Sequence, residues 1–320
     1  MTPPTIALKV DVDTYIGTRD GVPRLLEILD RFGIRATFYF SMGPDNSGKA
    51  IRRIFTRKGF LRKMLRTRAP SLYGLRTLLY GVFLPPPIIA DKVPHVLKET
   101  ARRGHEVGIH AWDHVKWHDL LPWIPHKIIA LDLGRAFALF EEILGRRART
   151  TAAPGWTVSR SSLEIQDSLL LSYCSDSRGT SPFYPVLDGH RFNTIQIPTT
   201  LPTMDELLGE QGITAETVNE HYLSLIGPGL TVHTIHAELE GGKLAPIFVD
   251  LLERLVARGV EFVTLGEVAD RVKREALPTC ELAMGELPGR AGKVALQGGA
   301  ASAPAVKGSS ASRPSATGRT

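Results

Sequence analysis

Two carboxylates end an apolar stretch near the start of the chain. Residues 6–10 read Ile-Ala-Leu-Lys-Val and lead directly into Asp11-Val12-Asp13. A stretch of this length and β-branched content is typical of a strand, in which alternate side chains share a face, so Asp11 and Asp13 should project from the same side. Two neighbouring like charges repel unless a cation or a proton lies between them. The pair therefore indicates a site for a cation or a proton, or else an ordinary polar strand end followed by a turn.

Two histidines follow a second apolar stretch, at 106–109. The chain reads His-Ala-Trp-Asp-His from His110 to His114, and this i, i+4 spacing brings both imidazoles onto one face of a helical turn. With one carboxylate from the first strand they would form a two-histidine, one-carboxylate metal site with open positions for water and substrate. His118 repeats the spacing. We favour His110 and His114 because His110 stands at the strand end, and we expect His118 to be a surface histidine.

Strand-like and helix-like stretches alternate over most of the chain. After the first strand, helices are predicted at 24–32, 89–103, 125–144, 159–170, 214–226, 245–258 and 266–273, and strands at 35–41, 106–110, 149–153, 172–176, 194–197, 231–236 and 261–264. The alternation favours an α/β fold with about seven or eight parallel strands, a barrel or barrel-like sheet whose strand ends share one face. The polar residues at predicted strand ends are Asp11, Asp13, His110, His114, Asp176, Arg178, His236 and Glu238.

We expect a single catalytic domain, residues 1–277, with one insertion and one tail. In the insertion, at 46–88, no acidic residue occurs between Asp45 and Asp91, whereas ten lysines and arginines do. Its apolar residues from 51 to 65 have helical spacing, and such a block is a solvated basic face, a nucleic-acid patch or a surface for anionic lipid. Residues 278–320 are rich in glycine, alanine, serine and proline, and we expect this tail to be disordered.

The composition is that of a globular chain. Its hydrophobic content is 43% and its mean hydropathy is −0.03. Cys174 and Cys280 form neither a disulfide framework nor a zinc finger, which favours a reducing compartment. We identify no signal peptide and no apolar run of the roughly 18 residues that a membrane span needs. A cytoplasmic location is therefore expected.

Several motifs together resemble a known family. The stretches Val-Asp-Val-Asp-Thr, Gly-His-Glu-Val-Gly-Ile-His-Ala-Trp-Asp-His, Ala-Ala-Pro-Gly-Trp and Thr-Ile-His are similar to the ordered motifs of the polysaccharide deacetylases, a family of metal-dependent carbohydrate de-N-acylases. Further stretches at 18–29, 43–46, 69–74, 196–203 and 234–241 resemble the 4-deoxy-4-formamido-L-arabinose–phosphoundecaprenol deformylases within it. The resemblance covers roughly residues 5–275. It implies the irregular (β/α) barrel of the deacetylases.

The resemblance also implies roles for individual residues. Asp11 would be the general base and His236 the general acid, with Asp176 orienting His236. One divalent metal ion, such as zinc, cobalt or manganese, would be bound by Asp13, His110 and His114. These roles fit the chemistry, because hydrolysis of an unreactive amide needs an activated water, stabilisation of an oxyanion and delivery of a proton to nitrogen.

One departure from the family pattern concerns the general base. Many family members pair that base with an arginine, whose position is occupied here by Ala152. Either the base is oriented in another way, or Arg178 reaches in to take the place of that arginine. For the substrate, we expect stacking of sugar rings on tryptophan and an oxyanion donor from the backbone at 154–156. The expected substrate-binding residues are Trp112, Pro154, Gly155, Trp156 and Arg178.

The function implied by the resemblance is removal of the N-formyl group from undecaprenyl-phosphate-linked 4-deoxy-4-formamido-L-arabinose. This reaction belongs to the aminoarabinose modification of lipid A and to polymyxin resistance. The enzyme would attach peripherally to the cytoplasmic face of the bacterial inner membrane through residues 49–84, without nucleic acid or an obligate protein partner. Two alternatives remain: an N-deacetylase of another amino sugar, and a non-catalytic protein that binds anionic lipid or nucleic acid.

Overall fold

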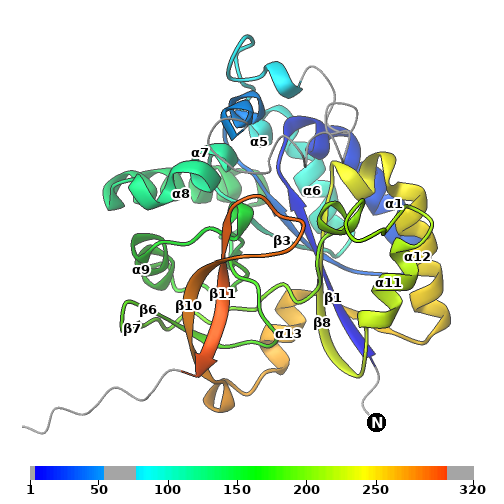
Figure 1. Ribbon diagram of the computed structural model, residues 1–320. Helices are drawn as coiled ribbons and strands as arrows, with labels where there is room; N and C mark the ends of the chain where they lie inside the picture. The colour runs from blue at the N-terminus through cyan, green and yellow to red at the C-terminus, as the bar shows by residue number, and fades with distance from the viewer. Residues whose placement is uncertain (1–3, 54–76, 301–320) are drawn as a thin grey trace, which may run out of the picture.

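A curved parallel sheet forms the centre of the computed structural model, which describes residues 4–53 and 77–300 (Figure 1). Six strands are hydrogen-bonded in the order β5-β4-β3-β2-β1-β8, and β9 pairs with the amino-terminal half of β1. The strands are β1 (Pro4–Val12), β2 (Thr37–Phe40), β3 (Glu106–Ile109), β4 (Thr150–Thr151), β5 (Tyr173–Cys174), β8 (Gly229–His236) and β9 (Glu261–Val263). All pairings in this sheet are parallel, which confirms the predicted α/β class.

An irregular segment, residues 194–201, lies between the two outer strands β5 and β8. On one side the Cys174 N–H donates to Ile195 O at 2.9 Å, and on the other the Thr200 N–H donates to Val232 O at 3.0 Å. The strand predicted at 194–197 is present only as this bridging segment. The sheet is therefore a barrel of seven regular strands in which an extended connection fills the remaining gap.

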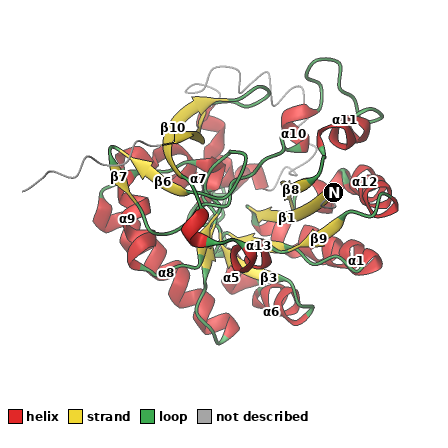
Figure 2. Ribbon diagram, turned by 90° about the horizontal axis from the view of Figure 1, so that it is seen from below, coloured by secondary structure: helices red, strands yellow, loops and turns green. Residues whose placement is uncertain are grey.

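Helices surround the strands when the molecule is seen from below (Figure 2). The helix predicted at 89–103 is divided at Val93, because Pro94 disfavours helical geometry in the residue before it. The helices are α1 (Val22–Phe32), α5 (Ile89–Lys92), α6 (Pro94–Arg102), α7 (His114–Leu120), α8 (His126–Leu144), α9 (Arg160–Ser168), α10 (Met204–Leu207), α11 (Val218–Leu225), α12 (Ala245–Ala257) and α13 (Leu265–Arg271).

The two faces of β1 pack against different surroundings. Leu8, Val10 and Val12 belong to the large apolar cluster that includes the buried residues of α1. Ala7, on the opposite face, belongs to a cluster inside the barrel together with Tyr39. Because strand side chains alternate, the inward face that begins at Ala7 continues through residues 9 and 11 to the carboxyl end of the strand.

The expectation of a disordered tail is wrong for residues 279–300. They form the antiparallel strands β10 (Thr279–Glu286) and β11 (Lys293–Ala300), which join β6 (Tyr184–Leu187) and β7 (His190–Arg191) in a second sheet. Small and polar residues are ordered here because the backbone pairs with an existing strand and a few apolar side chains, such as Leu282, reach a small core. Residues 301–320 lie outside the described part of the chain.

The insertion is described only at its two ends. The predicted amphipathic basic helix falls largely on residues 54–76, which lie outside the described residues. The two ends come together, since the Gly48 N–H donates to Tyr80 O at 3.0 Å and Pro44 forms an antiparallel bridge with Ile88. The insertion therefore leaves and re-enters the domain at one place.

The hairpin β10–β11 should contribute to global stability. Leu282 is buried with Phe183 and Phe192, so Leu282→Ala should lower the free energy of unfolding by about 3 kcal/mol. Met284, on the same strand and 39% exposed, provides the matched control. Met284→Ala should leave the free energy of unfolding almost unchanged. Urea unfolding measures both variants. Equal stability of Leu282→Ala and the wild type would contradict a structural role for the hairpin.

Candidate metal centre and active site

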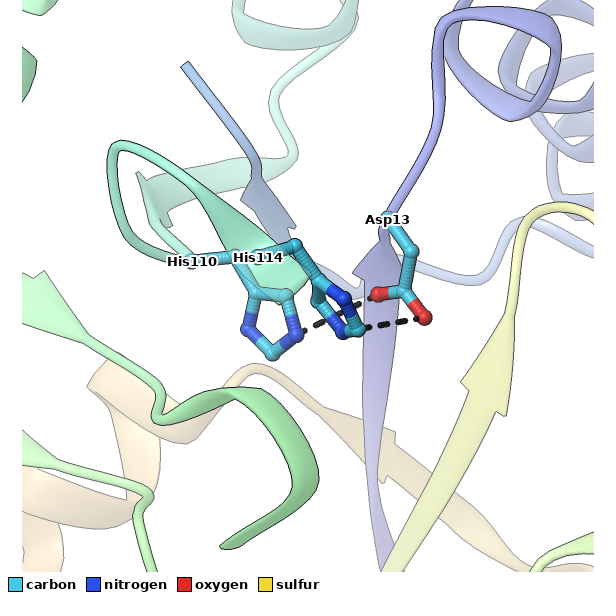
Figure 3. Close-up of side chains that lie close together, drawn as sticks. All are labelled: Asp13, His110 and His114. Carbon is cyan, nitrogen blue, oxygen red and sulfur yellow. Dashed lines mark ion pairs between the residues drawn. The ribbon is translucent and has the colours of Figure 1, made fainter. Parts of the chain in front are cut away.

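Three predicted metal ligands meet at the carboxyl end of the barrel (Figure 3). Asp13 directly follows β1, His110 directly follows β3, and His114 is the first residue of α7. Nε2 of His110 lies 3.2 Å from Oδ1 of Asp13, and Nε2 of His114 lies 3.3 Å from Oδ2. The carboxyl ends of β1 and β3, together with the first residue of α7, thus supply all three side chains.

The loop between the two histidines is held in a specific shape. Ala111 has a φ of 112°, a conformation that is strained for a residue with a Cβ and is often found at functional sites. The Asp113 carboxylate caps α7 by accepting the Lys116 N–H at 2.9 Å, and it also accepts from Asn46 Nδ2 at 2.7 Å. Because Asp113 is the cap, the helix begins at the next residue, His114, and this places His114 beside His110.

The protonation states of the group suit a cation. Burial alone raises the pKa of Asp13, but the imidazoles of His114 and His110 hold it well below its ordinary value. Burial lowers the pKa of His114 to about 4, although the charge of Asp13 opposes this shift. At neutral pH the group therefore offers an ionised carboxylate and a neutral imidazole, the forms in which these side chains bind metals.

The three side chains fit a divalent metal ion. Their ligand atoms lie within 4.8 Å of one another, and Oδ1 of Asp13 is buried without a hydrogen-bond partner among the described residues. One oxygen and two imidazole nitrogens suit zinc, cobalt or manganese and leave coordination positions open. His118 is not one of these three residues, which supports the preference for the pair His110 and His114. Its ring fills the space where a Cβ on Gly155 would lie.

Glu238 supports the candidate metal ligand Asp13 through hydrogen bonds from the turn that follows β1. Its Oε1 accepts hydrogen bonds from the backbone N–H groups of Asp13 at 3.0 Å and of Thr14 at 2.8 Å, and from the Thr14 hydroxyl at 2.8 Å. The carboxylate thereby fixes the turn that follows β1. The sequence placed Glu238 at a strand end, but nothing in the pattern indicated that it would contact the backbone of the first strand.

Asp11 and His236 lie side by side on adjacent strands. They are paired in the parallel register of β1 and β8. Their side chains therefore project from the same face of the sheet. Burial by itself lowers the pKa of His236, but the carboxylates of Asp13, Asp205 and Asp11 raise it more, so the net shift is upward. The backbone N–H of His236 donates to Glu240 Oε2 at 2.8 Å, which fixes the strand end.

The expected contact between Asp176 and His236 is not found in the described structure. Oδ2 of Asp176 instead accepts hydrogen bonds from the side-chain amides of Gln166 at 2.9 Å and Gln196 at 3.1 Å. Nδ1 of His236 is buried without a hydrogen-bond partner in the residues described. The hydrogen bond predicted between Asp176 and His236 is therefore not made: two buried glutamines, one of them in α9, hold Oδ2 of Asp176, and its Oδ1 is buried without a hydrogen-bond partner among the described residues.

Arg178 does not pair with the predicted base either. Its Nη1 donates to both oxygens of Glu206 at 3.0 Å, and its Nη2 donates to Leu201 O at 2.9 Å. The residue that contacts Asp11 is Lys9, whose Nζ lies 3.0 Å from Oδ2. The only sequence signal for this pair was a lysine in an otherwise apolar strand, two positions before the aspartate and on the same face.

The loop after β4 was expected to supply an oxyanion donor and a ring on which a sugar stacks. Gly155 has a φ of 62°, and the Trp156 N–H donates to Ala153 O at 3.1 Å, so in the described structure the free N–H of the loop is that of Gly155. Trp156 itself is only 2% exposed, and Lys9, Arg178 and Arg290 lie over its ring. Its predicted stacking with a sugar is therefore wrong, because cations already cover its ring. Trp112 is partly exposed.

Comparisons with known proteins agree with this geometry. The sequence profile of the polysaccharide deacetylases matches residues 1–174. A protein of Shewanella sediminis, designated a probable 4-deoxy-4-formamido-L-arabinose-phosphoundecaprenol deformylase, is 40% identical over 288 residues, which cover 90% of this chain and 92% of that protein. A protein of Wigglesworthia glossinidia brevipalpis with the same designation is 34% identical and covers 88% of this chain and 98% of its own. The crystal structure of a polysaccharide deacetylase homologue from Mycobacterium smegmatis has the same fold, with a TM-score of 0.60 at 17% identity over 90% of this chain and 99% of that one.

Metal binding should depend on His114 and not on His118. We expect His114→Gln to weaken binding of zinc or cobalt to the metal-stripped protein by more than the roughly 10- to 100-fold that loss of a supporting hydrogen bond costs. His118→Gln makes the same chemical change one helical turn later and should bind metal like the wild type. Isothermal titration calorimetry measures both affinities. A larger loss in His118→Gln would move the ligand set to His114 and His118.

Proposed function

Because the chain belongs to the polysaccharide deacetylase family, we propose that it is a deformylase that uses a divalent metal ion to hydrolyse an amide. Its substrate is undecaprenyl-phosphate-linked 4-deoxy-4-formamido-L-arabinose, and its products are formate and the free 4-amino sugar used to modify lipid A. The substrate is inferred from the designation of relatives that are 40% and 34% identical over nearly their whole length. The geometry that carries the activity is the convergence of Asp13, His110 and His114 next to Asp11 and His236.

The mechanism assigns one proton transfer to each of the two side chains next to the metal ligands, Asp11 and His236. A divalent ion held by Asp13, His110 and His114 would lower the pKa of a water molecule and polarise the formyl oxygen. Asp11 is the general base that accepts the proton of the attacking water. Its Oδ1 is suited to this role because it is buried without a hydrogen-bond partner among the described residues and lies on the side of His110, whose Nδ1 is 3.9 Å away.

His236 is the general acid that protonates the departing sugar nitrogen. It stands across from Asp11 in the register of the two strands, so a formamide bound at the mouth of the barrel can meet the base and the acid at the same time. The Gly155 N–H is available to stabilise the oxyanion that the formyl oxygen becomes when water attacks the carbonyl carbon. Glycine is required there both by its positive φ and by the ring of His118, to which a Cβ would come within 2.5 Å.

We further propose that the enzyme acts at an anionic membrane surface, on the cytoplasmic face of the inner membrane. No helix among the residues described is long and apolar enough to cross a bilayer. The insertion supplies a cationic sequence, and its first residue is attached to the loop between His110 and His114, since Asn46 Nδ2 donates to Asp113 Oδ2 at 2.7 Å. Just before the insertion, the Gly43 N–H donates to Trp112 O of the same loop at 2.8 Å. A membrane contact through residues 49–84 would thus bring a lipid-linked sugar close to the metal ligands.

Release of formate is the direct test of the activity. The purified protein, reconstituted with zinc, cobalt or manganese, should release formate from the lipid-linked formamido sugar in detergent. Asp11→Asn should lower kcat by roughly 10²–10⁴-fold, the usual contribution of a general base, while metal affinity is kept. The acetamido analogue serves as the control substrate. Faster release of acetate than of formate would favour the N-deacetylase alternative, and full turnover by Asp11→Asn would refute its assignment as the base.

Membrane attachment is tested separately with vesicles. Arg62→Glu, Lys63→Glu and Arg66→Glu combined should abolish most co-sedimentation with phosphatidylglycerol vesicles, because each cation near such a surface contributes about 1 kcal/mol. A matched triple change at the exposed residues Arg146, Arg147 and Arg149 should leave binding unchanged. If the two triple variants bind equally well, the insertion is not the membrane contact. Vesicles of phosphatidylcholine show how much of the binding depends on charge.

A further inference from the structure

We propose that Lys9 is the positioning residue of the general base. It takes the place of the arginine that many family members have at the position of Ala152. The inference rests on the proposed role of Asp11. Lys9 and Asp11 are two residues apart on β1 and face the inside of the barrel, where Nζ of Lys9 lies 3.0 Å from Oδ2 of Asp11. The cation thus comes from the same strand as the base rather than from the loop after β4.

The surroundings of the pair exclude solvent almost completely. The Lys9 side chain is 0% exposed and that of Asp11 is 4% exposed. In such surroundings an ion pair is not screened by water, and removing one partner leaves the other as an isolated buried charge. Because Lys9 is fully covered, it cannot itself touch a substrate at the mouth of the barrel. Its influence on the reaction passes through neighbouring groups, and the one to which it donates a hydrogen bond is Asp11.

Two aromatic rings hold the ammonium group in place. Nζ of Lys9 lies 5.2 Å from the ring centroid of Trp156 and 5.7 Å from that of Tyr39, distances at which a cation is attracted to an aromatic face. The rings are fixed in turn, because Trp156 Nε1 donates to the Thr199 hydroxyl at 3.1 Å and the Tyr39 hydroxyl lies 3.0 Å from that of Thr150. A lysine side chain, which is flexible on a surface, is therefore rigid here.

The contact divides the two oxygens of the base between two tasks. Oδ2 of Asp11 is bound to Lys9, whereas Oδ1 is buried and without a hydrogen-bond partner in the part of the chain described. Anchoring one oxygen fixes the rotation of the carboxylate, so that the other stays directed toward the side of His110. A base held in this way needs no reorganisation when the water molecule gives up its proton.

The test uses a variant that keeps the shape of the lysine and removes its charge. We expect Lys9→Met to lower kcat for formate release by about 10²-fold with little change in KM or in metal affinity. Lys9→Arg, which retains the cation, should recover at least a tenth of the wild-type kcat. Lys98→Met, at an exposed position on α6, is the control for loss of a lysine and should be fully active.

A double-mutant cycle separates positioning from an independent contribution. If Lys9 acts only through Asp11, Lys9→Met combined with Asp11→Asn should be no slower than Asp11→Asn alone. Three results would each overturn the inference. The first is a double variant whose loss of kcat is the product of the two single losses; the others are a wild-type kcat in Lys9→Met and a Lys9→Arg as slow as Lys9→Met. An inactive wild type would instead count against the proposed function. If the wild type is inactive, or if Lys9→Met folds poorly, the crystal structure of Lys9→Arg tests the inference instead. The inference requires that the Asp11 carboxylate keep its contact with the cation.

Discussion

The burial of ionised side chains at one end of the barrel is the constraint on which the rest of the structure depends. Asp11 and Asp13 are carried into this region by a single strand, and each requires a partner, because an unpaired buried carboxylate is strongly destabilising. For Asp13 the partners are two imidazoles at 3.2 and 3.3 Å, and a metal ion would complete the set. For Asp11 the partner is Lys9. Two carboxylates that share a face thereby acquire different environments and can perform different tasks.

Several elements of the fold serve to keep these partners in position. The cap on α7 and the strained Ala111 place the histidines, and Glu238 accepts the backbone donors of the turn that holds Asp13. The second sheet contributes from further away. Arg290, between β10 and β11, lies 4.5 Å from the ring of Trp156 and shares Glu206 with Arg178, so the end of the chain helps to fix the indole on which Lys9 rests. Part of the geometry of the candidate site thus depends on a hairpin more than 260 residues from Asp11 in the sequence.

Much of the fold and the metal centre could be predicted from local pattern. The alternation of helical and extended stretches gives the class of fold, since each pattern reflects which side chains must be buried. The predicted end of the first helix at residue 32 is also found, because Gly33 follows it in the left-handed conformation that ends many helices. The convergence of the three candidate metal ligands was predictable because His110 and His114 have helical spacing and Asp13 follows a strand. The tail was not predictable in this way, because β10 and β11 are ordered by pairing with a strand from residues 184–187 and not by their own apolar content.

The sequence by itself determined which residues reach the mouth of the barrel, because the two-residue period of a strand and the 3.6-residue period of a helix are local properties of the chain. Only the tertiary structure decided which of those residues touch. Arg178 was expected beside Asp11 and Asp176 beside His236, yet Glu206 holds Arg178 and two glutamines hold Asp176. Lys9 became the partner of Asp11 because Trp156 and Tyr39, from other strands and loops, close around its side chain. The choice of partner depends on packing between distant segments, which no local pattern records.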